Sequence, residues 1–354
     1  MRGFGERVAD VQRLVRGARR IAGDPALRDA IVRSSGLSRE GVDRAFERHL
    51  ETDPSDADLA SLVRAAGDAE RVHVVLSANV FVAALRAIAL ARAAATRVTV
   101  RPSSRDAAFP RALVEAAGDP AIELADEADL GAIARGEVHV YGRDATIDAV
   151  RAAVRPGVIV RGHGAGLGVA CVLAGAAGDP DAALRESAMA LAEDVVPFDQ
   201  RGCSSPRVAF VVGDEHRASR FVRHMHDALN AAEARVPRGD LGAGEREGAA
   251  RYADAVAFAG ELLRGPAHLV GMTRHLAVPP PGRHVHVVPA PSLDDVAAIL
   301  RPIARQVVAV GLSGAARRDA FPAHARVTPL GRMQRPPLDG PVDLRPAVRV
   351  SKDG

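Results

Sequence analysis

The sequence has few aromatic side chains and almost no lysine. Only 3% of its 354 residues are aromatic and none is Trp, so the core must consist largely of aliphatic side chains. Of 47 basic residues only Lys352 is lysine, which excludes a Schiff base inside the fold and a P-loop lysine. The net charge is +3 and no basic run alternates with aromatic residues, so the composition argues against nucleic-acid binding.

Cysteine and long apolar runs are also scarce. Two cysteines in different surroundings do not form a disulfide framework, which favours a reducing, cytoplasmic location. The N-terminus has no apolar segment typical of a signal peptide. The longest apolar stretch, residues 80–95, is interrupted by Arg86 and Arg92 and is too short and too charged to span a bilayer. We therefore expect no membrane span.

The apolar pattern changes near residue 70. Residues 1 to about 68 have helical spacing, whereas strand-like and helix-like segments alternate from Arg71 onward. Such alternation is typical of right-handed βαβ units. The sequence thus predicts an α/β fold in which parallel sheets carry helices on both faces.

The two cysteines differ in their expected roles. Cys171 lies within the apolar run 168–173 and is interpreted as a small buried core residue. Cys203 lies in the polar turn 198–206, just before an apolar strand, where a cysteine can present a nucleophilic thiolate. When Cys203 is considered alone, a structural role is slightly favoured over a catalytic one.

Polar residues follow several of the expected strands. Asn79 comes after a strand and before a helix, where it serves either as a helix N-cap or as a donor to an oxyanion. Arg101, Ser103 and Ser104 end the next strand, where a ribose or phosphate can be held. Gly142 follows a later strand and precedes a helix N-terminus suited to a pyrophosphate.

Several common motifs are absent. The glycines of residues 162–168 fall at alternate positions and do not form G-x-G-x-x-G, and there is no Walker A loop or H-E-x-x-H. His216 and His224 share a helix face without an evident third ligand, so we expect no metal site.

The order of these features along the chain is more specific than any one of them. It resembles the aldehyde dehydrogenase superfamily, and more closely the long-chain acyl-CoA reductase family, which includes the reductase subunit of the bacterial luminescence fatty-acid reductase complex. The resemblance covers about residues 70–340, and its matching segments are residues 77–80, 101–106, 141–146, 162–164, 199–206 and 331–338.

The resemblance implies an aldehyde dehydrogenase-like fold with two Rossmann-like, parallel-sheet domains. We expect an N-terminal helical segment (1–70), a nicotinamide-cofactor-binding domain (71–195), a catalytic thiol domain (196–325) and an extended tail (326–354). By the same resemblance Cys203 is the nucleophile, Asn79 an oxyanion donor and His163 a candidate for proton transfer. The residues implied to lie along the cofactor are Arg101, Ser103, Ser104, Gly142 and Gly162.

Two departures from the superfamily pattern bear on the chemistry. Arg101 stands where lysine is usual, which is compatible with recognition of a 2′-phosphate. Gly162, His163 and Gly164 stand where the superfamily usually has the general-base glutamate. Aldehyde oxidation requires a base to activate water, whereas reduction of a thioester does not. The missing glutamate therefore favours reduction of an acyl thioester.

The sequence accordingly predicts NADPH-dependent reduction of a long-chain fatty acyl-CoA to the aldehyde, with NAD as the alternative cofactor. The rival functions are reduction of another activated acyl group, aldehyde dehydrogenation, and a non-catalytic partner subunit that kept the fold. The resemblance further implies a homo-oligomer and an acyl-protein synthetase or carrier as partner.

Overall fold

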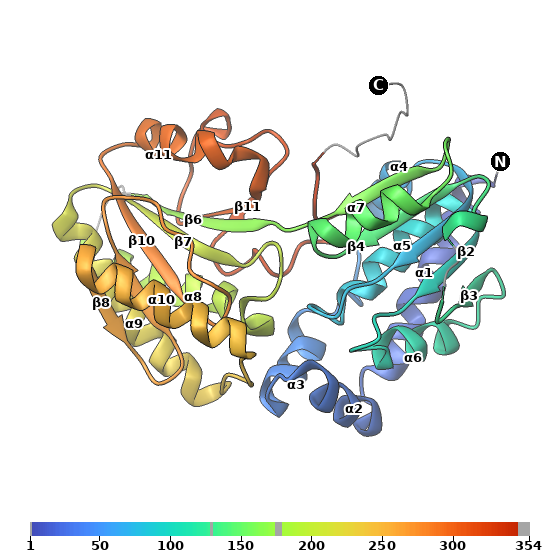
Figure 1. Ribbon diagram of the computed structural model, residues 1–354, viewed down its shortest axis with the longest axis horizontal. Coiled ribbons are helices and arrows are strands. Elements are labelled where there is room, and N and C mark those ends of the chain that lie inside the picture. Colours follow the sequence, from blue (N-terminus) through green and yellow to red (C-terminus); the bar gives the residue numbers. More distant parts are fainter. Residues whose placement is uncertain (1, 128–129, 174–178, 346–354) are drawn as a thin grey trace.

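The computed structural model describes residues 2–127, 130–173 and 179–345, so the end of the expected tail, from residue 346, lies outside the described residues. The chain forms two α/β domains side by side (Figure 1). None of the helices within the described ranges is long and apolar enough to cross a membrane.

The first domain begins with four helices, as the sequence predicts. They are α1 (Phe4–Ile21), α2 (Pro25–Ser35), α3 (Arg39–Arg48) and α4 (Asp56–Ala65). A five-stranded parallel sheet follows, in the order β3-β2-β1-β4-β5. Its elements are β1 (Ala69–Val75), α5 (Ala83–Ala94), β2 (Ala95–Arg101), α6 (Ala108–Ala117), β3 (Ile122–Leu124), η1 (Leu130–Ala132), β4 (Glu137–Tyr141), α7 (Asp144–Ala153) and β5 (Ile159–His163).

Helices cover both faces of this sheet. Val72 and Val98 pack in one core with α1, α5 and α6, whereas Val138 and Val160 pack on the other face against α7. Every residue of α5 from Ala84 onward is buried, as expected of a helix enclosed on all sides. The first sheet is thus a doubly wound layer.

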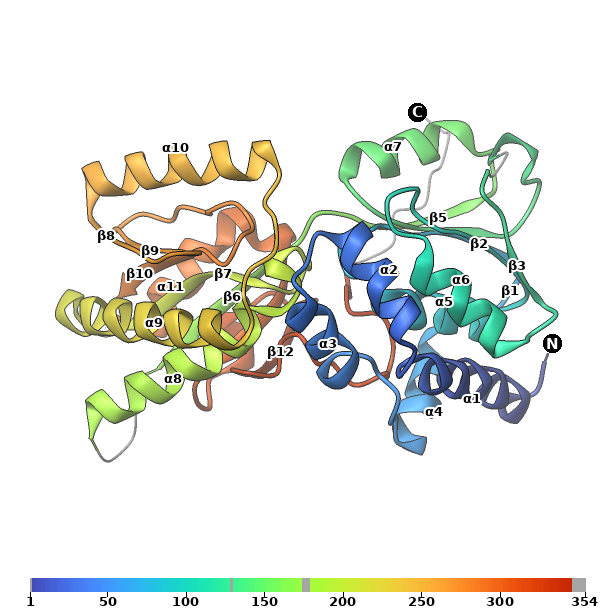
Figure 2. The same cartoon turned by 90° about the horizontal axis from the view of Figure 1, so that it is seen from below.

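The second domain contains a seven-stranded sheet in the order β12-β11-β6-β7-β10-β9-β8. Its elements are β6 (Leu167–Val172), α8 (Pro180–Val195), η2 (Pro197–Gln200), β7 (Pro206–Val212), α9 (Glu215–Arg235), α10 (Ala243–Ala259), β8 (Glu261–Arg264), β9 (Leu269–Met272), β10 (Val285–Ala290), α11 (Leu293–Leu300), η3 (Arg301–Gln306), β11 (Val307–Leu312), η4 (Arg318–Ala320) and β12 (Arg326–Pro329). Helices α8 and α9 cover one face, and α10 lies on the other (Figure 2).

The structure corrects two details of the expected architecture. The second sheet is mixed, because the edge strand β8 runs antiparallel to β9. Strand β8 follows α10 directly along the chain. The chain also passes from the first sheet to the second at residues 164–166, some thirty residues before the expected boundary at 195/196. The reason is that β6 pairs with β7 and β11 and so belongs to the second domain.

The crossing at residues 164–166 positions the site. Strand β5 ends at His163 and β6 starts at Leu167, so the chain runs almost directly from one sheet into the other (Figure 1). The carboxyl ends of the first sheet's strands therefore face the amino ends of the second sheet's parallel strands. The loop that carries Cys203 precedes β7, a central strand of the second sheet, and so faces this junction.

Candidate active site

A cavity lies at the junction of the two domains. It encloses about 780 Å³ including its open mouth, within the range usual for small-molecule sites. Helix α5, the Cys203 loop and the segment 334–343 supply most of its walls. The lining residues are His49, Glu51, Val80, Val82, Ala83, Arg86, Ala87, Leu90, Tyr141, His163, Phe198, Gly202, Cys203, Ser204, Gln334, Pro336, Pro341, Val342 and Asp343.

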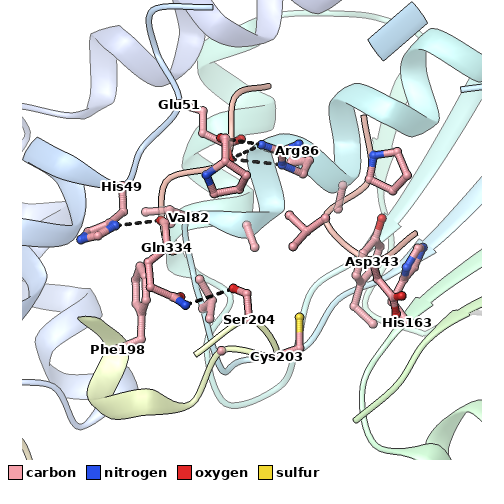
Figure 3. Close-up of a pocket in the computed structure, with 18 of the residues that line it drawn as sticks. His49, Glu51, Val82, Arg86, His163, Phe198, Cys203, Ser204, Gln334 and Asp343 are labelled. Atoms are coloured by element: carbon pink, nitrogen blue, oxygen red, sulfur yellow. Dashed lines mark hydrogen bonds and ion pairs between the residues drawn. The ribbon is translucent and has the colours of Figure 1, made fainter. Parts of the chain in front are cut away.

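Cys203 presents its sulfur to this cavity (Figure 3). The side chain is half-buried. Burial raises the pKa of Cys203 to about 11, and the nearby Asp343 carboxylate adds to the rise. Hydrogen bonds from the backbone N–H groups of Cys203 and Ser204 act in the opposite direction and stabilise the thiolate. Cys171, in contrast, is fully buried within β6, as the sequence predicts for a core residue.

Three consecutive residues before Cys203 have left-handed backbone conformations. Phe198, Asp199 and Gln200 have φ angles of 54°, 49° and 67°, each of which costs roughly 1–3 kcal/mol for a non-glycine residue. Such strain persists only where the surroundings over-determine the conformation. The buried Asp199 carboxylate meets the Arg283 guanidinium at 2.8 Å and accepts a hydrogen bond from the Gly239 N–H.

The Gln200 side chain fastens both ends of the Cys203 loop. Its Nε2 donates to the carbonyl oxygens of Pro206 and His284 at 2.7 and 2.8 Å. Its Oε1 accepts from the His284 N–H at 2.9 Å, and the residue is 1% exposed. Since Pro206 begins β7 and His284 precedes β10, Gln200 ties the loop to two neighbouring strands of the second sheet.

The alternating glycines before and within β6 let the Cys203 loop approach. A Cβ at Gly166 would lie 2.9 Å from the Cβ of Cys203, and a Cβ at Gly168 would overlap the Ser204 and Ser205 backbone. Only glycine fits at such a distance. Glycine at positions 166 and 168 therefore allows the Cys203 loop to pack directly against the chain at the start of β6.

The segment after β12 closes the site from the C-terminal side. Buried Asp194, on α8, accepts hydrogen bonds from the Gly331 and Met333 N–H groups at 2.6 and 2.8 Å. Gln334 Nε2 then donates to Ser204 Oγ at 3.1 Å, as Figure 3 shows. Two of the segments that carry the sequence resemblance, 199–206 and 331–338, thus touch each other next to Cys203.

His163 lines the cavity together with Cys203, and its ring stacks on Tyr141 with the ring centroids 4.4 Å apart. Burial lowers the pKa of His163 to about 4, so the imidazole is neutral at pH 7. A base of that strength cannot hold the proton of a thiol whose pKa is about 11. His163 therefore lies at the same cavity as Cys203 without being basic enough to deprotonate it.

Asn79 lies in the loop after β1, exposed and outside the lining of the cavity. The next residue, Val80, does line it and lies close to Gly202. Asn79 does not cap α5, whose N-cap is Val82, so that alternative interpretation is wrong. The structure brings Cys203 and His163 together and leaves Asn79 beside the site rather than in it.

The expected cofactor residues cluster at the carboxyl ends of the first sheet's strands. Arg101 ends β2 and is half-buried, and Ser103 forms a bridge with Asp106. Ser104 is exposed in the same turn. Gly142 precedes α7, whose N-cap residue makes no side-chain hydrogen bond. The Gly142 N–H donates to the His163 carbonyl oxygen. Gly162 lies near the end of β5, where a Cβ would press on Ile147 of α7.

The cavity also contains acidic residues that sequence reasoning missed. Asp343 is buried and paired with Arg345, whose guanidinium also donates to the Gly164 and Ala165 carbonyl oxygens. Glu51 is paired with Arg86. No local motif marks either carboxylate, because each reaches Cys203's cavity only through the tertiary fold. Within the described ranges, no group of three metal-ligand side chains occurs.

Comparison with solved structures places this architecture among the aldehyde dehydrogenases. The chain is similar to an NAD-dependent benzaldehyde dehydrogenase from Corynebacterium glutamicum (16% identity, 88% of this chain, 76% of that chain, TM-score 0.64). It is also similar to an NADP-dependent glyceraldehyde-3-phosphate dehydrogenase from Bacillus halodurans complexed with NADP (13% identity, 93% of this chain, 79% of that chain, TM-score 0.63). It matches proline utilization A with 15% identity and a TM-score of 0.64, covering 88% of this chain but only 37% of that longer one.

These identities support the fold alone. No curated protein sequence matches the chain. The model of one protein family does, over residues 37–349, and its description is acyl-CoA reductase (LuxC). This match spans most of the chain, including both domains and the Cys203 loop. The chain therefore belongs to the LuxC acyl-CoA reductase family and is an oxidoreductase acting on acyl or aldehyde groups.

Proposed function

We propose that this protein reduces a fatty acyl-CoA to the aldehyde with NADPH, through an acyl-enzyme on Cys203 and with release of CoA. The observation that carries the proposal is the state of the two carboxylates in the cavity. Asp343 is paired with Arg345, and Glu51 is paired with Arg86 and lies on the side of the cavity away from Cys203, so neither carboxylate is placed as a free base that activates water beside the sulfur. An acyl group on Cys203 in this apolar cavity is thereby protected from hydrolysis.

The acylation step uses the chain's own groups. The Cys203 sulfur attacks the thioester carbonyl carbon, a new C–S bond forms, and the bond to the CoA sulfur breaks. The Cys203 N–H is a proposed oxyanion donor. Asn79 is a second, and it has to turn from its exposed position toward Gly202 to reach the oxyanion. CoA leaves with the proton that the thiol gives up.

The edge of the first sheet fits a nucleotide cofactor, whose chemistry is delivery of a hydride to the acyl carbon. Arg101 ends β2, Arg105 follows it and Arg143 follows β4; within the described residues their guanidinium groups make no hydrogen bond or ion pair. Unpaired guanidinium groups at strand ends suit phosphates. They favour NADPH over NADH, and we expect Arg101→Ala to raise the KM for NADPH more than that for NADH.

A two-stage experiment tests the function. Radiolabelled acyl-CoA alone should label the protein and release one equivalent of CoA, and NADPH added afterwards should remove the label as aldehyde. Cys203→Ala should abolish labelling, whereas the matched variant Cys171→Ala should retain it, since Cys171 is sealed within β6. Release of the label as free acid would instead support an acyl hydrolase or aldehyde dehydrogenase. Absence of labelling would support a non-catalytic subunit.

A further inference from the structure

A second cavity adjoins the one that holds Cys203. It encloses about 680 Å³ including its open mouth. Its walls come from strands β4 and β5, from helices α4 and α5, and from the chain at residues 341–345. Ala65 and Ala66 line the second cavity and not the first, whereas Cys203 lines the first and not the second. The two cavities are therefore neighbours, and the sulfur opens into one of them.

A partition of five side chains separates the two cavities. The residues that line both are Leu90, Tyr141, His163, Pro341 and Asp343. Tyr141 and His163 are paired in register on the adjacent strands β4 and β5. Their rings lie face to face, with centroids 4.4 Å apart and planes inclined by 10°. Two stacked rings thus form the centre of the partition.

The fold fixes the direction in which both rings project. Side chains alternate between the two faces along a strand. Val140 of β4 and Val160 of β5 pack against α7, so Tyr141 and His163 project toward the opposite face, where α5 lies. Asp343, bonded to Arg345, closes the partition from the C-terminal side. Strands rather than a loop therefore hold the two rings in place.

The second cavity suits an alkyl chain once the partition is open. Ala65 and Leu90 contribute apolar surface to it. Its polar wall is neutralised internally, because Glu137 accepts hydrogen bonds from Arg161 at 2.5 and 2.9 Å and lies 3.0 Å from His139 Nε2. An alkyl chain that passes this wall meets charges that already have partners, which limits the cost of burying it there.

An acyl group on Cys203 lies in the first cavity, where α5 supplies apolar walls (Figure 3). Each methylene group buried against such walls strengthens binding until the chain fills the available space. His163 and Asp343 lie together at one side of this cavity, where the second cavity begins. A longer chain that turns to this side meets the partition.

We propose that the stacked pair of Tyr141 and His163 sets the longest acyl chain that the enzyme reduces efficiently, by closing the second cavity to an acyl group on Cys203. This inference rests on the proposed acyl reduction and specifies its substrate range. Tyr141 is then a specificity-determining residue, which acts through its size.

A series of straight-chain acyl-CoA thioesters of increasing length tests the inference, with kcat/KM measured in the presence of NADPH. For the unaltered enzyme we expect kcat/KM to rise roughly fourfold per methylene group and to stop rising at the length that fills the first cavity. In Tyr141→Ala the rise should continue beyond that length. Tyr141→Phe is the matched control, since it keeps the ring and its stack on His163, and it should keep the original limit.

Two further variants place the effect in the second cavity. His163→Ala removes the other ring of the pair, so it should extend the limit as well and carries the test if Tyr141→Ala does not fold. Ala65→Phe, introduced together with Tyr141→Ala, narrows the second cavity and should shorten the limit again; alone it should leave the limit unchanged, because the chain does not reach Ala65 in the unaltered enzyme.

The outcomes separate this inference from the function on which it rests. An unaltered enzyme without a length limit overturns the inference, and so does a limit that stays unchanged in both Tyr141→Ala and His163→Ala; in either case the acyl reductase stands. Absence of reduction of every thioester by the unaltered enzyme overturns both.

Discussion

The Gln200 side chain offers the sharpest test of how Cys203, the proposed nucleophile, is positioned. Gln200→Ala removes three hydrogen bonds, two donated to carbonyl oxygens and one accepted from a backbone N–H, and leaves those three groups buried and unpaired. Each such loss costs about 1–3 kcal/mol, so we expect about 3 kcal/mol or more. For a domain of this size that corresponds to a Tm lower by about 6–12 °C.

The same substitution should slow acylation more than it weakens substrate binding. The loop between Gln200 and Pro206 carries Cys203, and a misplacement of about 1 Å of a reacting group costs about 100-fold in rate. We expect kcat to fall by that order while KM for acyl-CoA changes little. Thermal unfolding and steady-state kinetics measure the two effects. The exposed Gln306→Ala is the control and should change neither.

A charged substitute separates positioning from mere loss of packing. Gln200→Glu keeps the shape but places a carboxylate against the carbonyl oxygens of Pro206 and His284, and only its protonated form can donate to one of them. Both Tm and kcat, each taken relative to the unaltered enzyme at the same pH, should therefore recover as pH falls. If Gln200→Ala matches the Gln306→Ala control, or Gln200→Glu shows no recovery at low pH, the positioning argument fails.

Three further predictions follow from the same cavity. Because the pKa of Cys203 is raised to about 11, the rate of its alkylation by iodoacetamide should rise about tenfold per pH unit between roughly pH 7 and 10, with no plateau near pH 8. The buried Cys171 should stay unlabelled in the folded protein. Asp343→Asn removes a negative charge that raises this pKa, so alkylation at pH 8 should be faster than in the unaltered protein, and an equal or slower rate contradicts the assignment. Gly168→Ala should abolish acylation because its Cβ overlaps the Cys203 loop, whereas Gly244→Ala, with open space around it, should leave acylation unchanged.

The sequence predicted the element types well where the apolar pattern was long and periodic. The first 68 residues contain four helices, and the apolar strand expected after Cys203 is β7. The domain boundary was misplaced because β6 is an apolar run that reads equally well as a core strand of either sheet. Its pairing with β7 and β11 is a long-range contact, and the sequence of residues 167–172 alone does not indicate which sheet the strand joins.

The candidate site was predicted in part. Cys203 and His163 do meet at one cavity, and the segment around Gln334 contacts the Cys203 loop. Asp343 and Glu51 were missed, because their relevance comes from where the tail and the N-terminal helices pack. An isolated acidic residue in a tail or after a helix has no pattern that distinguishes it from a solvated surface charge.

The raised pKa of Cys203 bears on the direction of the chemistry. At pH 7 a thiol with a pKa near 11 is ionised in roughly one molecule in ten thousand, and His163 is too weak a base to raise that fraction. In the proposed attack on an acyl-CoA thioester, the proton that Cys203 loses is taken up by the departing CoA sulfur, so the acylation step needs no net base. Hydrolysis of the acyl-enzyme does need one, to activate water. With His163 weakly basic and Asp343 paired with Arg345, the site favours the proposed transfer of the acyl group to hydride over its hydrolysis.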